Sequence, residues 1–449
     1  MRRREALAAL GLSALSVPAA APPVLSLSTF SADITVPLGH ALMGGGVAPA
    51  KRIDGPLEAR GFVLRGGGKP VVLCVLDWCE VRNDAHTRWR EVLAEAAGTD
   101  PARVLVSSIH QHDAPVADLE AERLLKAAKA AGSVCDPEFH EKAVQRTAKA
   151  LKAGRPRRVT HVGTGMAKAE RLASNRRWVG RDGKVSFGRT SATRDKAARD
   201  AEGGLIDPWL RCLSLWDGDK PLLALSAYAI HPMSYYGRGE VQGDFPALAR
   251  RLREADVPGV FQVYASGCSG NMTAGKYNDG APANRAALAS RLRGAMAAAW
   301  KATKRVALDS LAFRSVPYRL EPRGGEFTKE ALEKRLRTDK KPFGQCLAAL
   351  GLSWRKQADA GKKLDLPALT LGPAKLLLLP GECYVEYQLL AQRLAPGSFV
   401  VALGYGECAT GYVPTEKHWE ERDGNLDDWC WVAPGAEKAL AAAIASALK

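Results

Sequence analysis

Two histidines separated by a single residue, His110 and His112, follow an apolar stretch and are candidates for metal binding or proton transfer. Residues two apart in an extended segment lie on the same side of the chain, so the two rings would face the same way. That arrangement suits a metal, or one metal ligand beside one acid or base. A His-x-His pair alone is more often an ordinary surface or core pair, so other residues have to support this interpretation.

His231 and Glu382 stand in similar positions, each shortly after a strongly apolar run. A buried carboxylate such as Glu382, which follows four leucines and a Pro-Gly pair, is costly unless it is paired or bound to a metal. Taken alone, His231 is better explained as a hydrogen-bonded core histidine, and Glu382 as the N-terminal residue of a helix over 383–391. Taken with His110, the two complete the ligand set of catalytic zinc sites, which keep one position open for water. The three residues therefore predict a metal site.

The elements that must position these residues alternate between strand and helix. Ligands of α/β proteins bind beyond the carboxyl ends of strands, and the apolar segments here end in polar, Gly- or His-bearing stretches. The predicted strands are 70–76, 103–109, 221–230, 260–264, 375–379 and 399–403, with an edge strand over 309–320. The predicted helices are 84–97, 116–131, 137–153 after a capping Asp136, 244–255, 285–303, 328–337 and 436–448. The fold class is α/β, with mixed β-sheets covered by helices and a surface excursion over 168–204.

Composition excludes several classes of protein. With 46% hydrophobic and 25% charged residues, the 449-residue chain is neither mainly disordered nor a multi-span membrane protein. Its net charge of +16 raises nucleic acid or an anionic surface as a partner. Acidic residues interleave with the basic ones, as over 329–341, and no nucleic-acid-binding motif is present, so we expect no nucleic-acid partner. Weak peripheral contact with an anionic membrane stays open, as do the oligomeric state and the disulfide state of the nine cysteines.

The first 21 residues are typical of a targeting segment. Three arginines at 2–4 precede an apolar stretch over 6–17, and small residues over 18–22 suit cleavage near Ala21. The run at 2–7 resembles a twin-arginine signal, with an ordinary secretory signal as the alternative. We therefore expect an exported protein, periplasmic or secreted.

Five short segments resemble, in the same order, segments of the neutral/alkaline (non-lysosomal) ceramidases. They are Ala-Asp-Ile-Thr at 32–35 with Met-Gly-Gly at 43–45, Ser-Ser-Ile-His-Gln-His at 107–112, Ala-Ile-His-Pro at 229–232, Leu-Pro-Gly-Glu at 379–382 and Gly-Tyr-Val-Pro-Thr at 411–415. The resemblance implies a zinc-dependent amidohydrolase that cleaves ceramide, or a ceramide-like N-acyl lipid, into a fatty acid and a sphingoid base. It also implies one large catalytic domain over 22–449 without the C-terminal β-sandwich domain of that family.

The resemblance also implies roles for individual residues. One zinc ion per chain would be held by His110, His231, Glu382 and Tyr412. His112 would give a proton to the leaving amine. Arg176, in an Asn-Arg segment like that of the family, would face the developing oxyanion, with one more cation of a basic loop as the alternative.

The chain departs from the family where the family has a catalytic serine, because Thr273 stands there and Ser269 is a competing hydroxyl. Trp429 or Trp431 would fill the space of a second family tyrosine and could shorten the pocket. Two alternatives therefore stay open: a hydrolase of short N-acyl amines, and a catalytically degenerate periplasmic binding protein. The expected lining of the acyl pocket is Met233, Tyr235, Tyr236, Met272, Trp429 and Trp431.

Overall fold

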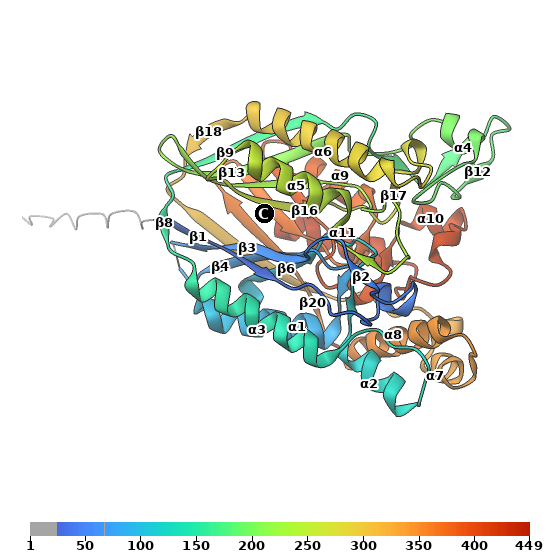
Figure 1. Cartoon of the computed structure of the whole chain (residues 1–449). Coiled ribbons are helices and arrows are strands. Elements are labelled where there is room, and N and C mark those ends of the chain that lie inside the picture. Colours follow the sequence, from blue (N-terminus) through green and yellow to red (C-terminus); the bar gives the residue numbers. More distant parts are fainter. Residues whose placement is uncertain (1–24, 67) are drawn as a thin grey trace, which may run out of the picture.

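Three β-sheets form the centre of the molecule in a computed structural model that describes residues 25–66 and 68–449 (Figure 1). The predicted targeting segment, 1–21, lies outside the described residues. The first sheet has the strand order β6-β4-β3-β1-β8, in which β4 and β6 are parallel and the other neighbours antiparallel. Its strands are β1 (Ser26–Asp33), β3 (Glu58–Arg65), β4 (Val71–Leu76), β6 (Val104–Ser108) and β8 (Arg157–Arg158).

The other two sheets have the same plan, with one parallel pair at an edge. In the order β16-β14-β13-β9-β18 the parallel pair is β14 and β16, and in the order β19-β20-β21-β23 it is β21 and β23. The second sheet consists of β9 (His161–Lys168), β13 (Trp209–Asp217), β14 (Lys220–Tyr228), β16 (Phe261–Ser266) and β18 (Lys304–Ala307). The third consists of β19 (Leu311–Tyr318), β20 (Leu364–Leu371), β21 (Ala374–Leu378) and β23 (Phe399–Leu403).

The three edge strands β6, β16 and β23 meet at their carboxyl ends. The backbone N–H of Ser108 donates to the carbonyl of Tyr405 at 3.0 Å, and that of Gly404 donates to the carbonyl of Ser266 at 2.9 Å. The segments that follow the parallel strands are thereby brought to one place, which is where α/β proteins bind ligands.

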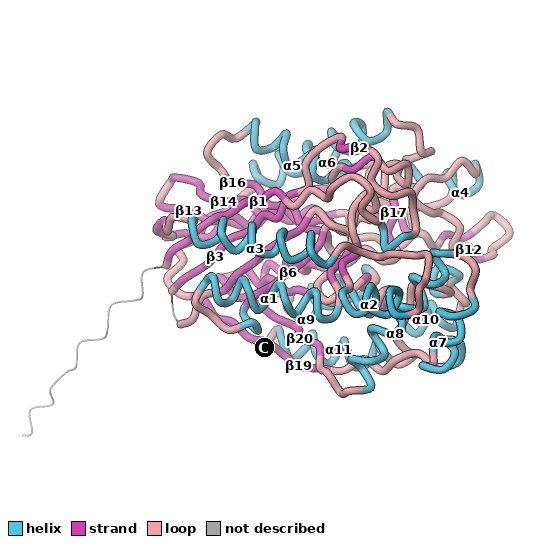
Figure 2. Tube along the Cα trace, turned by 60° about the horizontal axis from the view of Figure 1, so that its bottom comes forward, coloured by secondary structure: helices cyan, strands magenta, loops and turns pink. Residues whose placement is uncertain are grey.

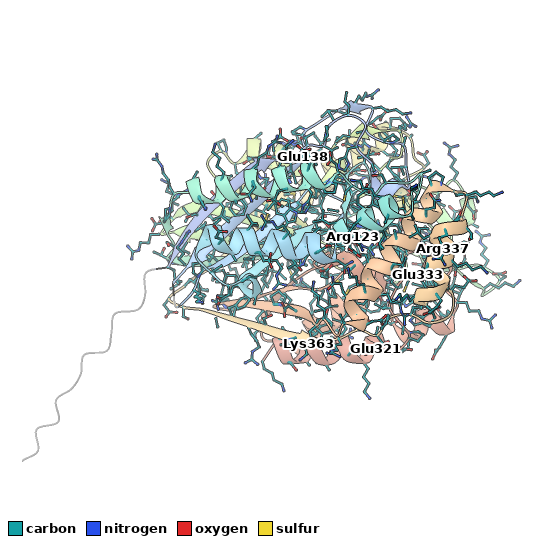
Figure 3. The ribbon with its side chains drawn as sticks, turned by 90° about the horizontal axis from the view of Figure 1, so that it is seen from below. Arg123, Glu138, Glu321, Glu333, Arg337 and Lys363 are labelled. Carbon is teal, nitrogen blue, oxygen red and sulfur yellow. The ribbon has the colours of Figure 1, made fainter. Side chains whose placement is uncertain are left out.

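Helices cover the outer faces of the sheets (Figures 1 and 2). The helices α1 (Asn83–Ala97) and α3 (Pro137–Ala153) pack on the first sheet, and α5 (Asp244–Asp256) and α6 (Ala283–Lys301) on the second. The third sheet contacts α9 (Val385–Leu394) and α11 (Ala436–Ala447). A separate group consists of α2 (Leu119–Ala127), α7 (Lys329–Thr338) and α8 (Pro342–Asp359), and Figure 3 shows it from below, with Arg123 on α2 and Glu333 and Arg337 on α7.

Short paired strands and two small helices complete the fold. The strand pairs are β2 (Arg52–Ile53) with β15 (Glu240–Val241), β5 (Glu80–Val81) with β7 (Val116–Ala117), β10 (Ser174–Asn175) with β17 (Met272–Thr273), β11 (Trp178–Val179) with β12 (Val185–Ser186), and β22 (Glu382–Cys383) with β24 (Tyr412–Val413). The small helices are α4 (Lys196–Asp200) and α10 (Glu416–Glu420). None of the helices in the described part of the chain is long and apolar enough to span a membrane.

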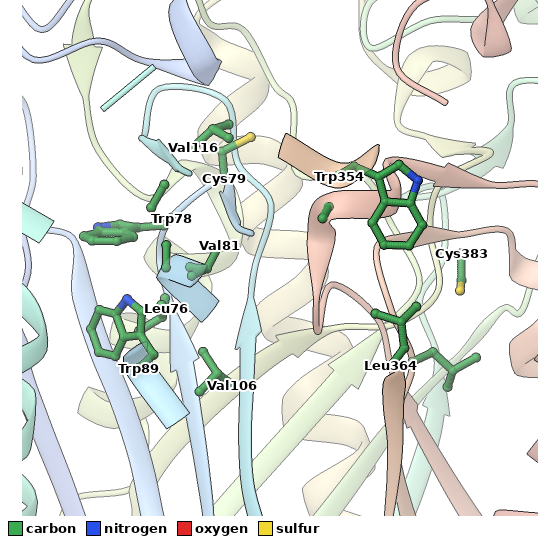
Figure 4. Packing of buried hydrophobic residues seen from close by; sticks show 14 of the residues in the cluster. Leu76, Trp78, Cys79, Val81, Trp89, Val106, Val116, Trp354, Leu364 and Cys383 are labelled. Carbon is green, nitrogen blue, oxygen red and sulfur yellow. The ribbon is translucent and has the colours of Figure 1, made fainter. Parts of the chain in front are cut away.

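Two hydrophobic clusters lie on opposite faces of the first sheet, and strand β4 contributes to both. Val72, Cys74 and Leu76 belong to the cluster beneath α1 and α3, whereas Val71, Leu73 and Val75 belong to the cluster shared with the second and third sheets. A strand buried on both faces must be apolar at every position, which explains why Val71–Leu76 is apolar without interruption. Figure 4 shows part of the first cluster, where Trp78 and Trp89 meet edge to face at 5.7 Å. All nine cysteines are buried free thiols.

The predicted elements are confirmed with one main exception. The Asp136 carboxylate accepts from the N–H groups of Glu138 and Phe139 and begins α3, as the sequence predicts. The single helix predicted over 116–131 is wrong. Its first two residues form β7, and the helix begins only after Asp118, whose carboxylate accepts from the N–H of Ala121 at 3.0 Å. Strand β19 is at a sheet edge, as expected from its proline.

Candidate metal centre

His110 is held by the turn that follows β6. Its backbone is left-handed, with φ at 65°, so the prediction of an extended His-x-His segment is wrong, although the rings of His110 and His112 still lie 5.2 Å apart. Nδ1 lies 3.1 Å from the carbonyl oxygen of Cys79, which can only accept, so the ring proton is on Nδ1. In the neutral ring Nε2 therefore keeps its lone pair, and Nε2 lies 3.2 Å from Oε2 of Glu382.

His231, after β14, has the same arrangement. Its Nδ1 lies 3.0 Å from the carbonyl oxygen of Ser269, and its Nε2 lies 3.5 Å from Oε2 of Glu382. Burial lowers the pKa of His231 well below its ordinary value, and the positive charge of Arg176 lowers it further. The ring is therefore neutral and offers a lone pair.

Glu382 is the buried carboxylate that both imidazoles face. It lies in β22, paired in parallel register with Tyr412 of β24, while α9 begins only at Val385. The alternative interpretation of Glu382 as a helix N-terminal residue is therefore wrong. Its Oε2 is buried and has no hydrogen-bond partner in the described structure. The ligand atoms of His110, His231 and Glu382 all lie within 4.8 Å of one another.

These three groups fit a divalent cation. Two imidazole lone pairs and a carboxylate oxygen are all electron donors, and placing them together in a buried site is costly unless something positive lies between them. A proton on one Nε2 would satisfy one contact and leave the other lone pair facing the carboxylate. A single cation satisfies all three, and a histidine that donates Nδ1–H to a carbonyl while offering Nε2 is the usual form of a metal ligand.

Arg176 and Tyr412 lie beside this group. Nη1 of Arg176 donates to the Tyr412 hydroxyl at 2.6 Å, and Nη2 lies 3.4 Å from Nε2 of His231. Burial raises the pKa of the Tyr412 hydroxyl, and the guanidinium opposes that rise. Arg176 is only 5% exposed, so it does not belong to the solvated cations of its loop. Its neighbour Arg177 does pair with an acid, Glu421, at 2.5 Å.

His112 faces the same space with neither ring nitrogen hydrogen bonded to the described residues. Burial lowers the pKa of His112 well below its ordinary value, and His110 and Arg176 lower it further. The edge of the Tyr236 ring contacts the imidazole, with centroids 4.7 Å apart. Both nitrogens of His112 are thus free to hydrogen bond to a ligand.

A cavity of about 360 Å³ opens onto these residues. Trp429 forms part of its wall, stacked on Phe343 at 6.3 Å and donating from Nε1 to Glu80 at 3.0 Å. The expectation that Met272 and Trp431 line a pocket is wrong, because both pack in the hydrophobic clusters. The wall consists of Met43, Cys79, His110, His112, Phe343, Glu382, Tyr412, Gly424, Asn425, Asp427, Asp428 and Trp429. Two other expected lining residues lie elsewhere, with Met233 buried and Tyr235 stacked against Arg285.

Thr273 is not joined to this group by any hydrogen bond in the described structure. Its hydroxyl donates to the carbonyl of Thr190 at 2.6 Å and accepts from the N–H of Gly275 at 2.9 Å. Ser269 lies closer to the chemistry, since its carbonyl orients His231 and its hydroxyl is 2.7 Å from that of Tyr405.

Two further residues of the site escaped the sequence analysis. Tyr405 stacks on His110 with ring centroids 4.4 Å apart. Glu80 is buried, and its Oε1 lies 3.7 Å from Nδ1 of His110. Their positions in the sequence could have indicated both residues. Tyr405 lies between two glycines directly after a buried strand, and Glu80 follows β4, the strand that pairs with β6.

Comparison with known proteins identifies the fold. No protein-family description and no curated protein sequence matches the chain. Solved structures do match, among them a crystal structure of neutral ceramidase from Pseudomonas aeruginosa, at 19% identity, and a ceramidase complexed with C2, at 18% identity. Both matches have a TM-score of 0.68 and cover 95% of this chain, with 74% of the first structure and 75% of the second. The chain therefore has a neutral ceramidase-like fold.

Proposed function

We propose that the protein is a zinc-dependent amidohydrolase that cleaves the amide of a ceramide-like N-acyl lipid into a fatty acid and a sphingoid base. The observation that carries the proposal is the convergence of two imidazole Nε2 atoms on the unpartnered Oε2 of Glu382, at the wall of a cavity. The neutral ceramidase-like fold supports it.

One zinc ion would be held by His110, His231, Glu382 and Tyr412. Bound zinc supplies Lewis-acid polarisation of the amide carbonyl and increases the acidity of water at the site. The residues around it prepare the donors: the carbonyls of Cys79 and Ser269 fix the two imidazoles, and Arg176 holds the Tyr412 oxygen.

His112 and Arg176 would act on the substrate. A neutral imidazole with two free nitrogens can carry a proton between water and the leaving amine. The Arg176 guanidinium, fixed by Tyr412 and Asn425, would stabilise negative charge on the carbonyl oxygen during attack. We assign Thr273 a structural role in its turn, since its hydroxyl is already used twice by the backbone.

The cavity favours a second candidate, the hydrolysis of short N-acyl amines. Its volume is about 360 Å³, and the bulky side chains of Phe343 and Trp429 form part of its wall. A short acyl chain would fit within it, whereas a long chain would have to extend outside.

For either substrate we propose that the protein is exported by the segment 1–21 and that 22–449 acts as one catalytic domain.

Elemental analysis of the purified protein, together with a chain-length series of N-acyl sphingosines and simple N-acyl amines, tests the proposal. We expect one zinc per chain and amide cleavage that is lost with a chelator and restored by zinc. Glu382→Gln should lose both zinc and turnover, His112→Gln only turnover, and the matched control His161→Gln on β9 neither. Zinc-loaded protein that cleaves no amide would leave a binding protein as the remaining function, and absence of zinc binding would overturn the metal site itself.

A further inference from the structure

The β11–β12 hairpin lies at one extremity of the molecule (Figure 1), and two of its valines are exposed. Val179 and Val185 pair directly across the hairpin and are 48% and 39% exposed. Their side chains lie side by side because directly opposite residues of an antiparallel pair project from the same face. Gly183, at φ 77°, provides the left-handed residue that the connecting turn needs.

The excursion of the chain that carries the hairpin exposes several large apolar side chains. Eight such side chains are exposed among the described residues, and three of them, Val179, Val185 and Leu205, come from this one excursion of the chain. The carbonyl of Leu205 accepts from the Asn175 side chain, which ties it to the base of the hairpin. Apolar groups gathered within a polar surface mark a place where something else binds.

The charge around the valines is positive. Arg181 and Lys184 are on the tip of the hairpin, and the Lys184 side chain is 84% exposed. Residues 171–204 contain nine Lys and Arg, of which Arg176 and Arg189 are buried, and four Asp and Glu. Asp182 lies 3.7 Å from Lys184 on the tip, so the exposed charge of this segment is positive by three. Apolar side chains that insert between headgroups, flanked by cations that attract anionic lipid, are the two signals by which peripheral proteins bind a bilayer.

The hairpin also lies next to the candidate metal centre. A hollow of about 410 Å³ is lined by Val185 and Phe187 on one side and by Gly424 and Asn425 on the other. Gly424 and Asn425 also line the cavity of the metal centre, so the two spaces adjoin across these two residues. A bilayer in contact with the hairpin would therefore deliver lipid beside the cavity.

We propose that Val179 and Val185, with Arg181 and Lys184, dock the protein on an anionic lipid bilayer and so bring a lipid substrate to the cavity. The second half of this proposal rests on the proposed function, whereas the docking itself does not. Docking through four side chains is weak and depends on salt, because the attraction falls off within about one Debye length, ~10 Å at 0.1 M salt.

Binding of the purified protein to vesicles tests the docking directly. We expect more protein to bind vesicles of phosphatidylcholine with phosphatidylglycerol than vesicles of phosphatidylcholine alone. The partition coefficient should fall about tenfold in the double variant Val179→Ser, Val185→Ser, which corresponds to ~1.4 kcal/mol. The pair Arg181→Gln, Lys184→Gln should lower binding to the anionic vesicles only. The matched control is Val306→Ser, a valine 42% exposed on β18, at the opposite end of the molecule in Figure 1, which should bind as the unchanged protein does.

Turnover separates docking from catalysis. On a short, water-soluble N-acyl amide the hairpin variants should keep the turnover of the unchanged protein, whereas on lipid in vesicles their KM should rise with kcat unchanged. Vesicle binding that is unaffected by the valine substitutions, or lowered equally by Val306→Ser, would overturn the proposal. A protein that cleaves no amide but loses vesicle binding with the hairpin would overturn the proposed function and leave the docking surface standing.

Discussion

Tyr405 stacks on His110 with ring centroids 4.4 Å apart and planes 15° apart, and both residues have a left-handed backbone, at φ 57° and 65°. Bulky residues rarely adopt this conformation, and it persists only where the surroundings enforce it. Here the N–H of Tyr405 donates to the carbonyl of Gly381, and its carbonyl accepts from Ser108. Backbone contacts between two sheets thus hold the pair, and the position of His110 is set before any metal binds.

Replacing Tyr405 by Phe should weaken zinc binding by roughly 10–100-fold, the effect typical of losing a group that orients a ligand. The stack on His110 remains, but the hydroxyl that contacts Ser269 at 2.7 Å and lies 3.4 Å from Nδ1 of His231 is lost. Competition with a chelator measures the affinity, and the spectrum of the cobalt-substituted protein reports ligand geometry. Tyr387→Phe, which removes a buried hydroxyl bonded to Pro414, is the control. Equal zinc affinity in both variants would show that Tyr405 only fills space.

Removing the metal should destabilise the folded protein. A ligand present at 1,000 times its dissociation constant stabilises the native state by about 4 kcal/mol, so a chelator should lower the melting temperature by the corresponding amount. In Glu382→Gln the melting temperature should no longer respond to zinc, since the one carboxylate among the three converging donors is replaced by an uncharged amide. A chelator response retained in that variant would place the metal elsewhere.

Local sequence patterns indicate three residues of the candidate site but not how they come together. His110, His231 and Glu382 can be singled out because each follows an apolar run, where burying a polar side chain is costly unless it has a partner. That these segments meet depends on three parallel pairs at the edges of three different sheets, which local patterns do not show. Tyr405 was overlooked because a buried aromatic residue is normal in any core.

Helix α8 lacks the local sequence pattern that would predict it. Ten of its residues are buried in a nearly unbroken run from Gly344 to Trp354, so the alternation of apolar and polar residues that marks an amphipathic helix is missing. Gly351 suggests a break, yet it is there because the Trp431 ring packs against it, and an added Cβ would lie 2.7 Å from the indole nitrogen. Only the tertiary contact explains the glycine.

Acid should destabilise the fold partly through His140. Burial lowers the pKa of His140 to about 4, whereas in the unfolded chain the ordinary value near 6.5 applies. Between these two values the unfolded state binds a proton that the folded state does not, so this contribution to stability is complete above pH 6.5 and is lost as the pH falls. Lowering the pH from 7 to 5 should therefore cost about 2 kcal/mol through this residue.

Urea unfolding of the unchanged protein and of His140→Gln at both pH values measures this contribution. Burial raises the pKa values of Asp113 and Glu407 to about 7, so protonation of these two carboxylates stabilises the folded state as the pH falls. Both proteins share this opposite contribution, so it cancels when their losses of unfolding free energy are compared. The loss of unfolding free energy between pH 7 and pH 5 should be about 2 kcal/mol smaller in the variant. An identical loss in both proteins would mean that His140 titrates normally in the folded state.

The role of Thr273 is decided by separating stability from turnover. Thr273→Val keeps the shape of the side chain but removes the hydroxyl that serves Thr190 and Gly275, and leaving the buried N–H of Gly275 unpaired costs about 1–3 kcal/mol. We expect a lower unfolding free energy with zinc content and turnover largely retained, because the hydroxyl is occupied by the backbone and is not activated by an adjacent base. Thr273→Ser should restore the stability. Loss of all turnover in Thr273→Val with zinc content and stability unchanged would instead identify Thr273 as a reacting group. Ser269→Ala, assayed in parallel, shows whether the Ser269 hydroxyl takes part in the reaction.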